Sequence, residues 1–200
     1  TVRQEKTTMN LAERAKNILL QPVQEWSIID KEPGSAAELY KSYIVPLAAI
    51  GPVASIIGLS IFGIGVPVGG SFRPTLTSAI GWAVTAYVFA LIGTYVLALV
   101  IDALAPTFHG AKNTFQALKV AAYSSTAAWL AGIFNLIPSL ALLHILGLYS
   151  VYLLYLGLPV LMKAPQEKAV PYTIVVIIAA IVIFGVITAL SSCFLTRPLP

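Results

Sequence analysis

Apolar residues occur in this chain as long unbroken runs, with polar residues between the runs. An α-helix needs roughly 20 apolar residues to cross about 30 Å of hydrocarbon. We therefore expect an all-α integral membrane protein with five spans, at about residues 44–66, 76–104, 118–136, 140–162 and 172–195. A transmembrane β-barrel is not expected, because the strands of such barrels alternate between apolar and polar residues.

Helix-interrupting residues separate these runs and support their limits. They are Pro67, Gly69, Gly70, Pro106, Gly110, Asn135, Pro138, Pro165 and Pro171. Pro46 and Pro52 lie inside the first run, where each removes a backbone donor and predicts a kink. The kinks form either a hinge that lines a site or an ordinary bend fixed by packing, and the second interpretation is favoured.

The composition excludes the other broad classes of protein. Apolar residues make up 58% of the 200 residues and charged residues 10%, against about 25% charged in a soluble domain. A chain of this size cannot bury that much apolar surface, and disorder requires the opposite composition. The net charge of +4 is not concentrated in a dense Lys/Arg patch, so we expect no nucleic-acid partner.

The distribution of positive charges predicts the orientation of the spans. With five spans, ten cationic residues lie on the side of the N-terminus and two, Arg73 and Arg197, on the other. The positive-inside rule then places the N-terminus in the cytoplasm and the C-terminus outside. The ten are Arg3, Lys6, Arg14, Lys16, Lys31, Lys41, Lys112, Lys119, Lys163 and Lys168.

Residues 1–34 form a cytoplasmic segment ahead of a membrane domain at residues 35–200. Apolar residues at helical spacing between Leu11 and Leu19 predict a short amphipathic helix. This helix either lies on the bilayer surface, with Arg14, Lys16 and Trp26 in contact with the membrane, or packs on the cytoplasmic ends of the bundle; the two interpretations are compatible. Ser35 and Glu38 have the spacing of a capping box, which predicts a helix that continues into the first span.

The sequence begins at Thr1, and its first long apolar run begins too late for a secretory signal. Met9 is a candidate native start, and the sequence leaves open whether residues 1–8 are native. The single cysteine, Cys193, excludes an internal disulfide framework.

Asp102 is the one acidic residue inside a predicted span, and Lys119 lies at a similar depth at the start of the third. A charge at that depth is costly unless it is paired. We therefore expect an Asp102–Lys119 pair that clamps the cytoplasmic end of spans two and three. A role of the pair in ion or proton transport is the less favoured interpretation.

Spans three and four carry aromatic and polar side chains that need partners in lipid, so we expect the two spans to face each other. The face consists of Tyr123, Ser124, Trp129, His144, Tyr149, Tyr152 and Tyr155. It forms either a polar cavity or contacts between helices, and the latter is favoured. His109 and His144 lie on opposite sides of the membrane and cannot share a metal ion, and no residue set for catalysis or for a cofactor is present.

Several stretches, in this order and spacing, resemble the bacterial branch of the Yip (Ypt-interacting protein) family. They are Lys16 to Pro22, Glu25-Trp26, Gly110 to Asn113, Tyr123 to Gly132 and Gly147 to Pro159. The resemblance implies five transmembrane helices with a cytoplasmic N-terminus. Eukaryotic relatives are linked to Rab-type GTPases, but the long N-terminal domain of those relatives has no counterpart in this sequence, so a Rab-type GTPase partner is not expected.

Two functions fit these observations. The first is a non-enzymatic scaffold of the bacterial inner membrane that organises the bilayer or binds partners, including a second copy of itself. The second is a small-solute or ion transporter with a polar path along spans one, three and four. The shortage of deep charges favours the scaffold, and the absence of an inverted repeat lowers the case for transport.

Overall fold

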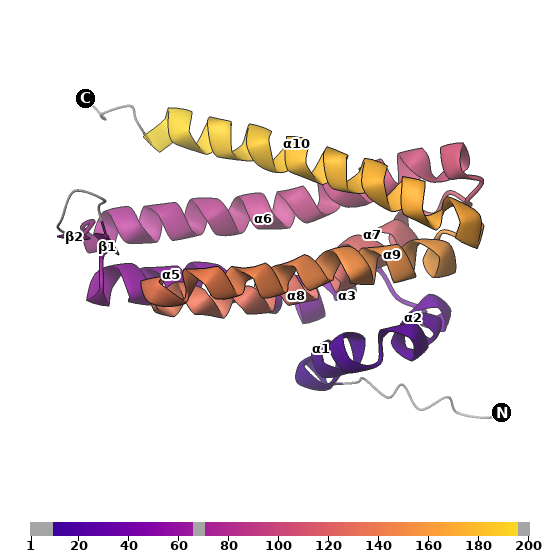
Figure 1. Ribbon diagram of the computed structural model, residues 1–200, viewed down its shortest axis with the longest axis horizontal. Coiled ribbons are helices and arrows are strands. Elements are labelled where there is room, and N and C mark those ends of the chain that lie inside the picture. Colours follow the sequence, from indigo (N-terminus) through magenta and orange to yellow (C-terminus); the bar gives the residue numbers. More distant parts are fainter. Residues whose placement is uncertain (1–9, 66–70, 196–200) are drawn as a thin grey trace.

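The computed structural model shows helices that lie along one long axis, with two short helices attached to the side of this bundle (Figure 1). The structure describes residues 10–65 and 71–195, and it includes side chains for 10–63 and 73–186. Arg3, Lys6, Arg197 and the interrupting residues 67–70 lie outside the described residues, as does the side chain of Cys193.

Four helical segments in the described ranges are long and apolar enough to cross a bilayer. They are Ala36–Ile61, Leu76–Phe108, Pro138–Leu161 and Gln166–Val186. Between 17% and 28% of the most apolar stretch of each segment is buried. The remaining apolar surface is too large for a soluble monomer, and it fits contact with lipid.

The first of these segments is a chain of short helices. It comprises α3 (Ala36–Leu39), the π-helix η1 (Tyr40–Ile44), α4 (Val45–Ala48) and α5 (Ile50–Ile61). The capping box predicted at its start is present, because Ser35 Oγ accepts from the Glu38 amide (3.2 Å) and Glu38 Oε2 accepts from the Ser35 amide (3.0 Å).

The two prolines of this segment lie next to irregular helix. Pro46 is the second residue of α4, which follows η1 directly, and a turn at Ala49 separates α4 from α5 before Pro52. The Ala49 amide does not bond back to Val45 as an α-helix requires, and the Tyr87 hydroxyl instead donates to the Val45 carbonyl at 3.0 Å. In lipid such a carbonyl needs a partner from the protein, and the neighbouring helix supplies it here.

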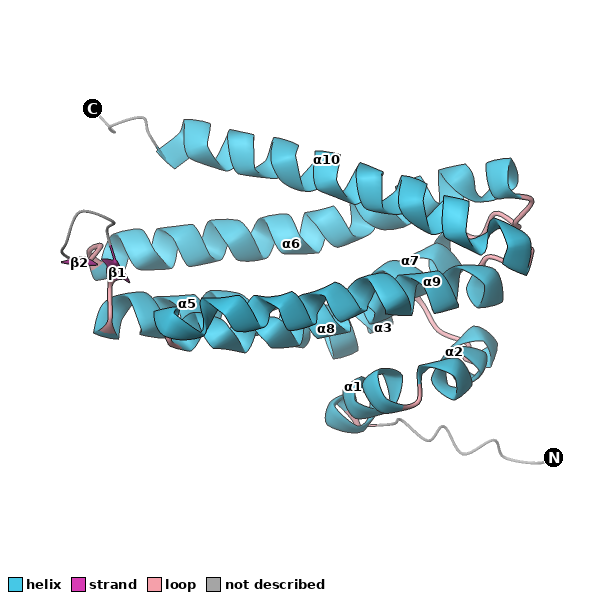
Figure 2. Ribbon diagram, in the orientation of Figure 1, coloured by secondary structure: helices cyan, strands magenta, loops and turns pink. Residues whose placement is uncertain are grey.

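A short hairpin joins the first segment to the second at one end of the bundle, called here the strand end (Figure 2). Strand β1 (Ile64–Gly65) pairs antiparallel with β2 (Ser71–Phe72). These two strands are a small departure from the all-helical expectation. Helix α6 (Leu76–Leu104) then runs to the opposite end, where η2 (Ala105–Phe108) follows it. We call this opposite end the loop end, after the loops at residues 109–113 and 162–165.

The predicted third span is not one of the four long segments. Residues 114–136 form α7 (Thr114–Ser124), α8 (Thr126–Ala131) and the 3-10 helix η3 (Gly132–Leu136), with a turn at Ser125 between α7 and α8. Every residue from 117 to 124 is buried. Helix α7 packs against α6 and α9 inside the bundle, so it has little surface left for lipid, whereas α8 and η3 pack against η4 and α5.

The last two long segments run in opposite directions. The 3-10 helix η4 (Pro138–Leu148) and α9 (Tyr149–Leu161) lead to the loop end, and η5 (Gln166–Lys168) and α10 (Ala169–Leu195) lead back. Tyr172 fixes the start of α10, because its hydroxyl donates to the Ile101 carbonyl of α6 and its ring stacks on Phe108 at 4.6 Å.

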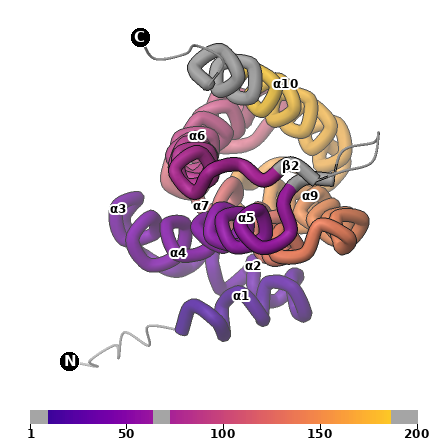
Figure 3. Tube along the Cα trace, turned by 90° about the vertical axis from the view of Figure 1, so that its left-hand side faces the viewer, coloured from indigo at the N-terminus to yellow at the C-terminus, as the bar shows by residue number. Residues whose placement is uncertain are grey.

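The two attached helices are α1 (Leu11–Leu20) and α2 (Pro22–Lys31). Viewed along the bundle, they lie on the side opposite α10 (Figure 3). Contacts of α2 with α9, and of α1 with α8, join them to the bundle near the loop end.

Candidate functional site

Three charged residues are buried among the described side chains, and all three lie where α1 and α2 meet the bundle. They are Arg14 of α1, Glu25 of α2 and Lys119 of α7. Burying a charge is costly unless it is paired and hydrogen-bonded, so their convergence makes this region the candidate site. We call it the docking junction, and it consists of Arg14, Glu25, Trp26, Glu32, Lys119, Tyr123 and Gly157.

Local sequence determines the two helices of the junction. Asn10 caps α1, since its side-chain oxygen accepts from the Ala12 amide, and Pro22 stands at the first position of α2, where its missing N–H costs nothing. Each helix buries one face against the bundle. Ile18 of α1 and Ile29 of α2 are completely buried there.

Trp26 is the largest side chain in the junction and is completely buried. Its indole ring lies over Gly157 of α9, where a Cβ atom would come within 2.7 Å of Trp26 Cζ2. Its ring also meets Tyr123 of α7 edge-on, with the centroids 6.2 Å apart. Glycine at position 157 therefore provides the space in which Trp26 binds the bundle. The indole Nε1 is buried without a hydrogen-bond partner.

Arg14 bridges the two carboxylates of the junction. Its Nη1 donates to Glu25 Oε1 at 2.5 Å, and its Nη2 donates to Glu32 Oε1. The guanidinium carbon lies 5.9 Å from the centre of the Tyr123 ring, within the range of a cation–π contact. Burial alone lowers the pKa of Arg14, but the hydrogen bond and charge of Glu32, together with Tyr123 and the charge of Glu25, outweigh it, so the net pKa is raised and the guanidinium stays charged.

Lys119 completes the charge balance by capping α2. Its Nζ donates to the carbonyls of Ile29 (2.8 Å) and Glu32 (2.7 Å) at the C-terminal end of that helix. Helix C-termini carry partial negative charge and unpaired carbonyls, which explains why a cation is stable at this point. Arg14 and Lys119 together balance Glu25 and Glu32, so the junction has no net charge.

Further contacts hold the helix pair around this centre. Gln116 Nε2 donates to the Asp30 carbonyl at 3.0 Å, and Lys163 Nζ pairs with Asp30 Oδ2 at 2.6 Å. The Tyr149 hydroxyl donates to the Leu19 carbonyl at 3.0 Å. These bonds come from α7, from the 162–165 loop and from α9, so three parts of the bundle position α1 and α2.

The junction also connects with the first membrane segment. The rings of Tyr43 and Tyr123 lie 4.5 Å apart, and the Tyr43 hydroxyl shares a 2.7 Å hydrogen bond with Thr126 Oγ1. Trp26, Tyr123 and Tyr43 thus form a continuous row of rings from α2 through α7 to η1.

The expected Asp102–Lys119 pair does not form. Asp102 instead accepts from the Asn113 amide (2.7 Å) and from Thr114 Oγ1 (2.9 Å), which fixes the turn into α7. Lys119 lies more than one turn further along α7 and faces α2. The expectation of a similar depth therefore did not identify the partner of either residue.

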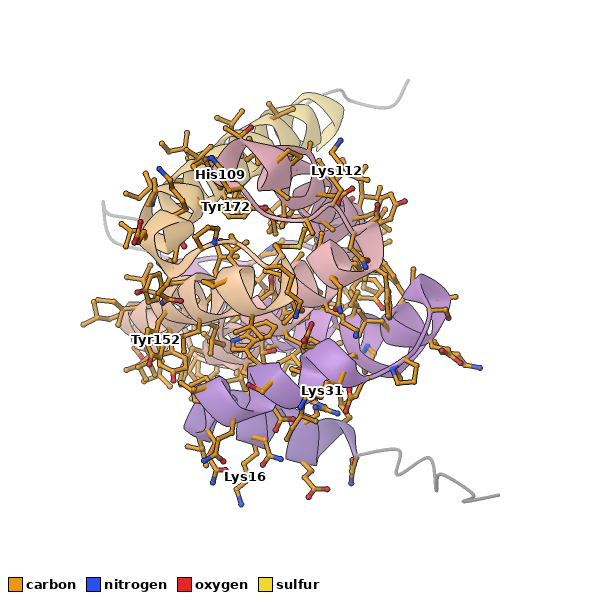
Figure 4. All side chains as sticks on the ribbon, turned by 90° about the vertical axis from the view of Figure 1, so that its right-hand side faces the viewer. Lys16, Lys31, His109, Lys112, Tyr152 and Tyr172 are labelled. Carbon is orange, nitrogen blue, oxygen red and sulfur yellow. The ribbon has the colours of Figure 1, made fainter. Side chains whose placement is uncertain are left out.

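The membrane-surface contacts expected for Arg14 and Trp26 also need correction. Both side chains are buried in the junction, at 6% and 0% exposure, because each finds partners on the bundle. Lys16 is exposed, and Figure 4 shows it pointing away from the bundle. Of the two interpretations left open by the sequence, packing on the bundle accounts for the buried face of α1 and α2.

The predicted polar-aromatic face divides among several places. Tyr123 and Ser124 are buried, and Tyr149 binds α1. Tyr152 is 44% exposed, and the Tyr155 hydroxyl accepts a long 3.5 Å bond from Gln166. The two spans do face each other, and Ser150 Oγ of α9 accepts from the Ala128 amide at 3.0 Å.

Trp129 and His144 lie apart from the junction. Trp129 lines an apolar cavity between α6, α8 and α10. His144 is exposed, with Nδ1 2.9 Å from the Ala141 carbonyl. No group of three His, Cys, Asp or Glu residues that could hold a metal ion occurs in the part of the chain that the structure describes.

Sequence reasoning missed Glu25, Glu32 and Gly157 as members of the junction. The available signals were Trp26 and Glu25 next to each other in an apolar cluster, and a glycine among the large side chains of span four. Neither signal identifies its partner, which lies more than 100 residues away for Trp26 and Gly157. The assembled site holds helices together, because its charged groups bind one another or a helix end.

Comparisons with known proteins agree with this architecture. Two curated relatives, both called inner membrane protein YohC, come from Escherichia coli strain K12 and from Escherichia coli O6:H1. Each is 24% identical to this chain over 174 residues, which cover 85% of this chain and 89% of the relative. No solved structure matches. The family model described as the Yip1 domain matches residues 16–187, which include every residue of the docking junction except Arg14. The chain therefore belongs to the Yip1 domain family, as its motifs predict.

Proposed function

We propose that this protein is a non-enzymatic scaffold of the inner membrane that organises the surrounding lipid through the outward face of α1 and α2. The observation that carries this proposal is the docked helix pair. It is fixed to the bundle on one side by the docking junction, and it presents apolar side chains flanked by lysines on the other.

The outward face has the composition of a membrane-interface contact. Leu20, Val23 and Ile28 are 68%, 62% and 44% exposed, and Lys16 and Lys31 are exposed beside them. Helices at a bilayer surface bury apolar side chains just below the headgroups and keep lysines at headgroup level. Each lysine near anionic lipid contributes about 1 kcal/mol to membrane attraction.

The topology that accompanies this function has five crossings with the N-terminus in the cytoplasm. Residues 114–136 support a fifth crossing, because they run lengthwise from the loop end to the strand end between α6 and α9 (Figure 1). The lysines of the loop end, Lys112, Lys163 and Lys168, support a cytoplasmic location for that end. The E. coli relatives carry an inner-membrane name, which supports the same membrane for this chain.

A scaffold function also explains why the charged groups of the docking junction bind partners within the protein. The charged groups of the junction bind one another or a helix end, and this arrangement holds α1 and α2 in one orientation toward the lipid. The structure gives the transport alternative no support, because the polar groups that could line a path have partners within the protein. Asp102 accepts a hydrogen bond from the Asn113 amide, and the Val45 carbonyl near the prolines accepts one from Tyr87.

Two spin-labelled proteins test the placement. In a Cys193→Ala background, Leu20→Cys and the control Lys112→Cys, at an exposed position of the 109–113 loop, are labelled and reconstituted into vesicles that contain phosphatidylglycerol. We expect the label at position 20 to be accessible to oxygen dissolved in lipid and the label at 112 to a water-soluble nickel complex. A label at position 20 that is accessible to water contradicts the proposal. A label shielded from both reagents identifies the face as a protein-binding surface instead.

Lipid recruitment is measured in the same vesicles by energy transfer from a donor on the protein to a fluorescent phosphatidylglycerol. We expect enrichment of this lipid around the native chain, and loss of the enrichment in Lys16→Gln/Lys31→Gln. The matched control is Lys41→Gln, which removes an exposed lysine outside α1 and α2. Equal enrichment in all three proteins contradicts the scaffold proposal.

A further inference from the structure

A cavity of about 410 Å³ lies between α6, α8 and α10, away from the docking junction. Small residues of α6, among them Ala86, Ala90 and Gly93, form one wall, and Ala180 and Ile183 of α10 form the opposite wall. Ser125 and Trp129 close the inner side. The cavity arises because α10 is held against α6 at Tyr172 and diverges from α6 beyond Val176, the last buried residue of α10 in the described range (Figure 1).

The lining offers little to a polar ligand or to water. Its two hydroxyl groups donate within their own helices, Thr94 Oγ1 to the Ala90 carbonyl (2.8 Å) and Ser125 Oγ to the Ala121 carbonyl (2.7 Å). The remaining lining residues are apolar apart from the indole N–H of Trp129. Apolar cavities exclude water and bind hydrocarbons, and one of roughly 150 Å³ already holds benzene. The space here is sufficient for a longer hydrocarbon.

The length of the cavity is close to the thickness of one leaflet of a bilayer. Its α6 wall extends from Ala86 to Leu97, which is about 16 Å along a helix, and half of the hydrocarbon thickness is about 15 Å. This wall spans the middle of α6, so the cavity lies at mid-membrane depth. The cavity is continuous with the lipid-facing surface at Phe184, which is 71% exposed.

We propose that this cavity is a binding site for one acyl chain of a membrane phospholipid. The chain lies along α6 between the diverging α10 and the Trp129 ring. The site differs from the outward face of α1 and α2, because it recognises hydrocarbon at mid-membrane depth and contains no charged group.

Photo-crosslinking tests the site in the full-length protein. The protein is reconstituted with a phospholipid that carries a diazirine in its acyl chain, and labelled peptides are mapped by mass spectrometry with increasing unlabelled phospholipid as competitor. We expect saturable labelling of the cavity walls, at peptides with Ala90 and Ile183. Lipid that only surrounds the bundle labels the exposed face of α6, at Val84 and Val88, to the same extent, and that result overturns the proposal.

Two substitutions fill the cavity from opposite walls. Ala90→Phe and Ala180→Phe are each expected to abolish the saturable labelling, whereas Val88→Phe adds the same ring to the outer face of α6 and leaves the labelling unchanged. A folded variant is identified by native helicity and a single symmetrical peak in gel filtration, and either variant alone suffices. Unchanged labelling in a folded filled variant overturns the proposal. Conversion of a dimer to a monomer by Ala90→Phe, without a change in labelling, assigns the cavity to a second copy instead.

Discussion

Trp26 of α2 lies flat against Gly157 of α9, close enough that a single added carbon at position 157 would come within 2.7 Å of the indole ring. The two residues are far apart in the sequence, yet their contact determines how the N-terminal helices bind the membrane domain. Most of the junction's polar contacts surround this one apolar contact.

Gly157→Ala tests the contact directly. The added methyl group collides with the rigid indole ring, and overpacking of this kind costs about 1–3 kcal/mol. We expect a lower melting temperature in detergent and faster proteolysis between residues 10 and 35. Gly81→Ala is the matched control, because no atom lies within 4 Å of the position of the new Cβ. Equal stability of the two variants would contradict the proposed packing.

Lys119→Met tests the cap on α2. Methionine keeps most of the side-chain volume but cannot donate to the Ile29 and Glu32 carbonyls, and loss of bonds from a charged donor costs roughly 1.5–3 kcal/mol. We expect faster amide exchange in α2, measured by mass spectrometry, with little change in α6. Lys112→Met, at an exposed loop position, should leave exchange in α2 at the native rate.

Arg14 and Glu25 should show strong coupling in a double-mutant cycle. Arg14→Met leaves two carboxylates without their cation, and breaking a buried pair from one side costs about 3–5 kcal/mol. Adding Glu25→Gln removes one of the stranded charges and should recover part of the loss. A coupling energy near zero in chemical unfolding would show that Arg14 and Glu25 act independently.

Asp102→Asn should be additive with Lys119→Met. Asp102 binds the Asn113 amide and the Thr114 hydroxyl, so loss of its charge weakens these bonds by about 1 kcal/mol. Because Asp102 and Lys119 share no partner, their effects on unfolding should add within about 0.5 kcal/mol. A larger deviation from additivity would instead support the Asp102–Lys119 ion pair that the sequence predicted.

Cysteine labelling tests the proposed topology. In the Cys193→Ala background, Lys112→Cys and Arg73→Cys place single thiols in the loop end and beside the strand end. An impermeant maleimide added to intact cells should label position 73 alone, and disruption of the membrane should expose position 112. Labelling of both thiols in intact cells would exclude a crossing by α6, which lies between them.

The limits of the long apolar helices were readable from the sequence, whereas rotation about the helix axes was not. Runs of apolar residues, with prolines and glycines between them, predicted the limits of α6 and α10 closely. In both helices, lipid-facing and bundle-facing positions are equally apolar, so no periodic pattern shows which side faces inward. Lys119 illustrates the consequence, since it binds the Ile29 and Glu32 carbonyls of α2 and not the predicted partner Asp102.

The N-terminal helices show the complementary case. Their amphipathic pattern predicted one buried face, but a bilayer and a helical bundle offer similar apolar surfaces. Trp26 and Arg14 therefore suited either environment. Gly157 favours the bundle, because the lack of a side chain there leaves room for the Trp26 ring, and the sequence does not reveal that the two residues meet.

Salt is expected to affect the docking junction and the exposed lysines of α1 and α2 differently. Arg14, Glu25 and Lys119 are buried and Glu32 is partly exposed, so dissolved ions screen most of these mutually balanced charges little. Lys16 and Lys31 remain in the solvent, where screening by about 0.15 M salt acts over roughly 8 Å. Raising the salt concentration should therefore weaken the proposed binding of α1 and α2 to anionic headgroups. The two helices should stay attached to the bundle.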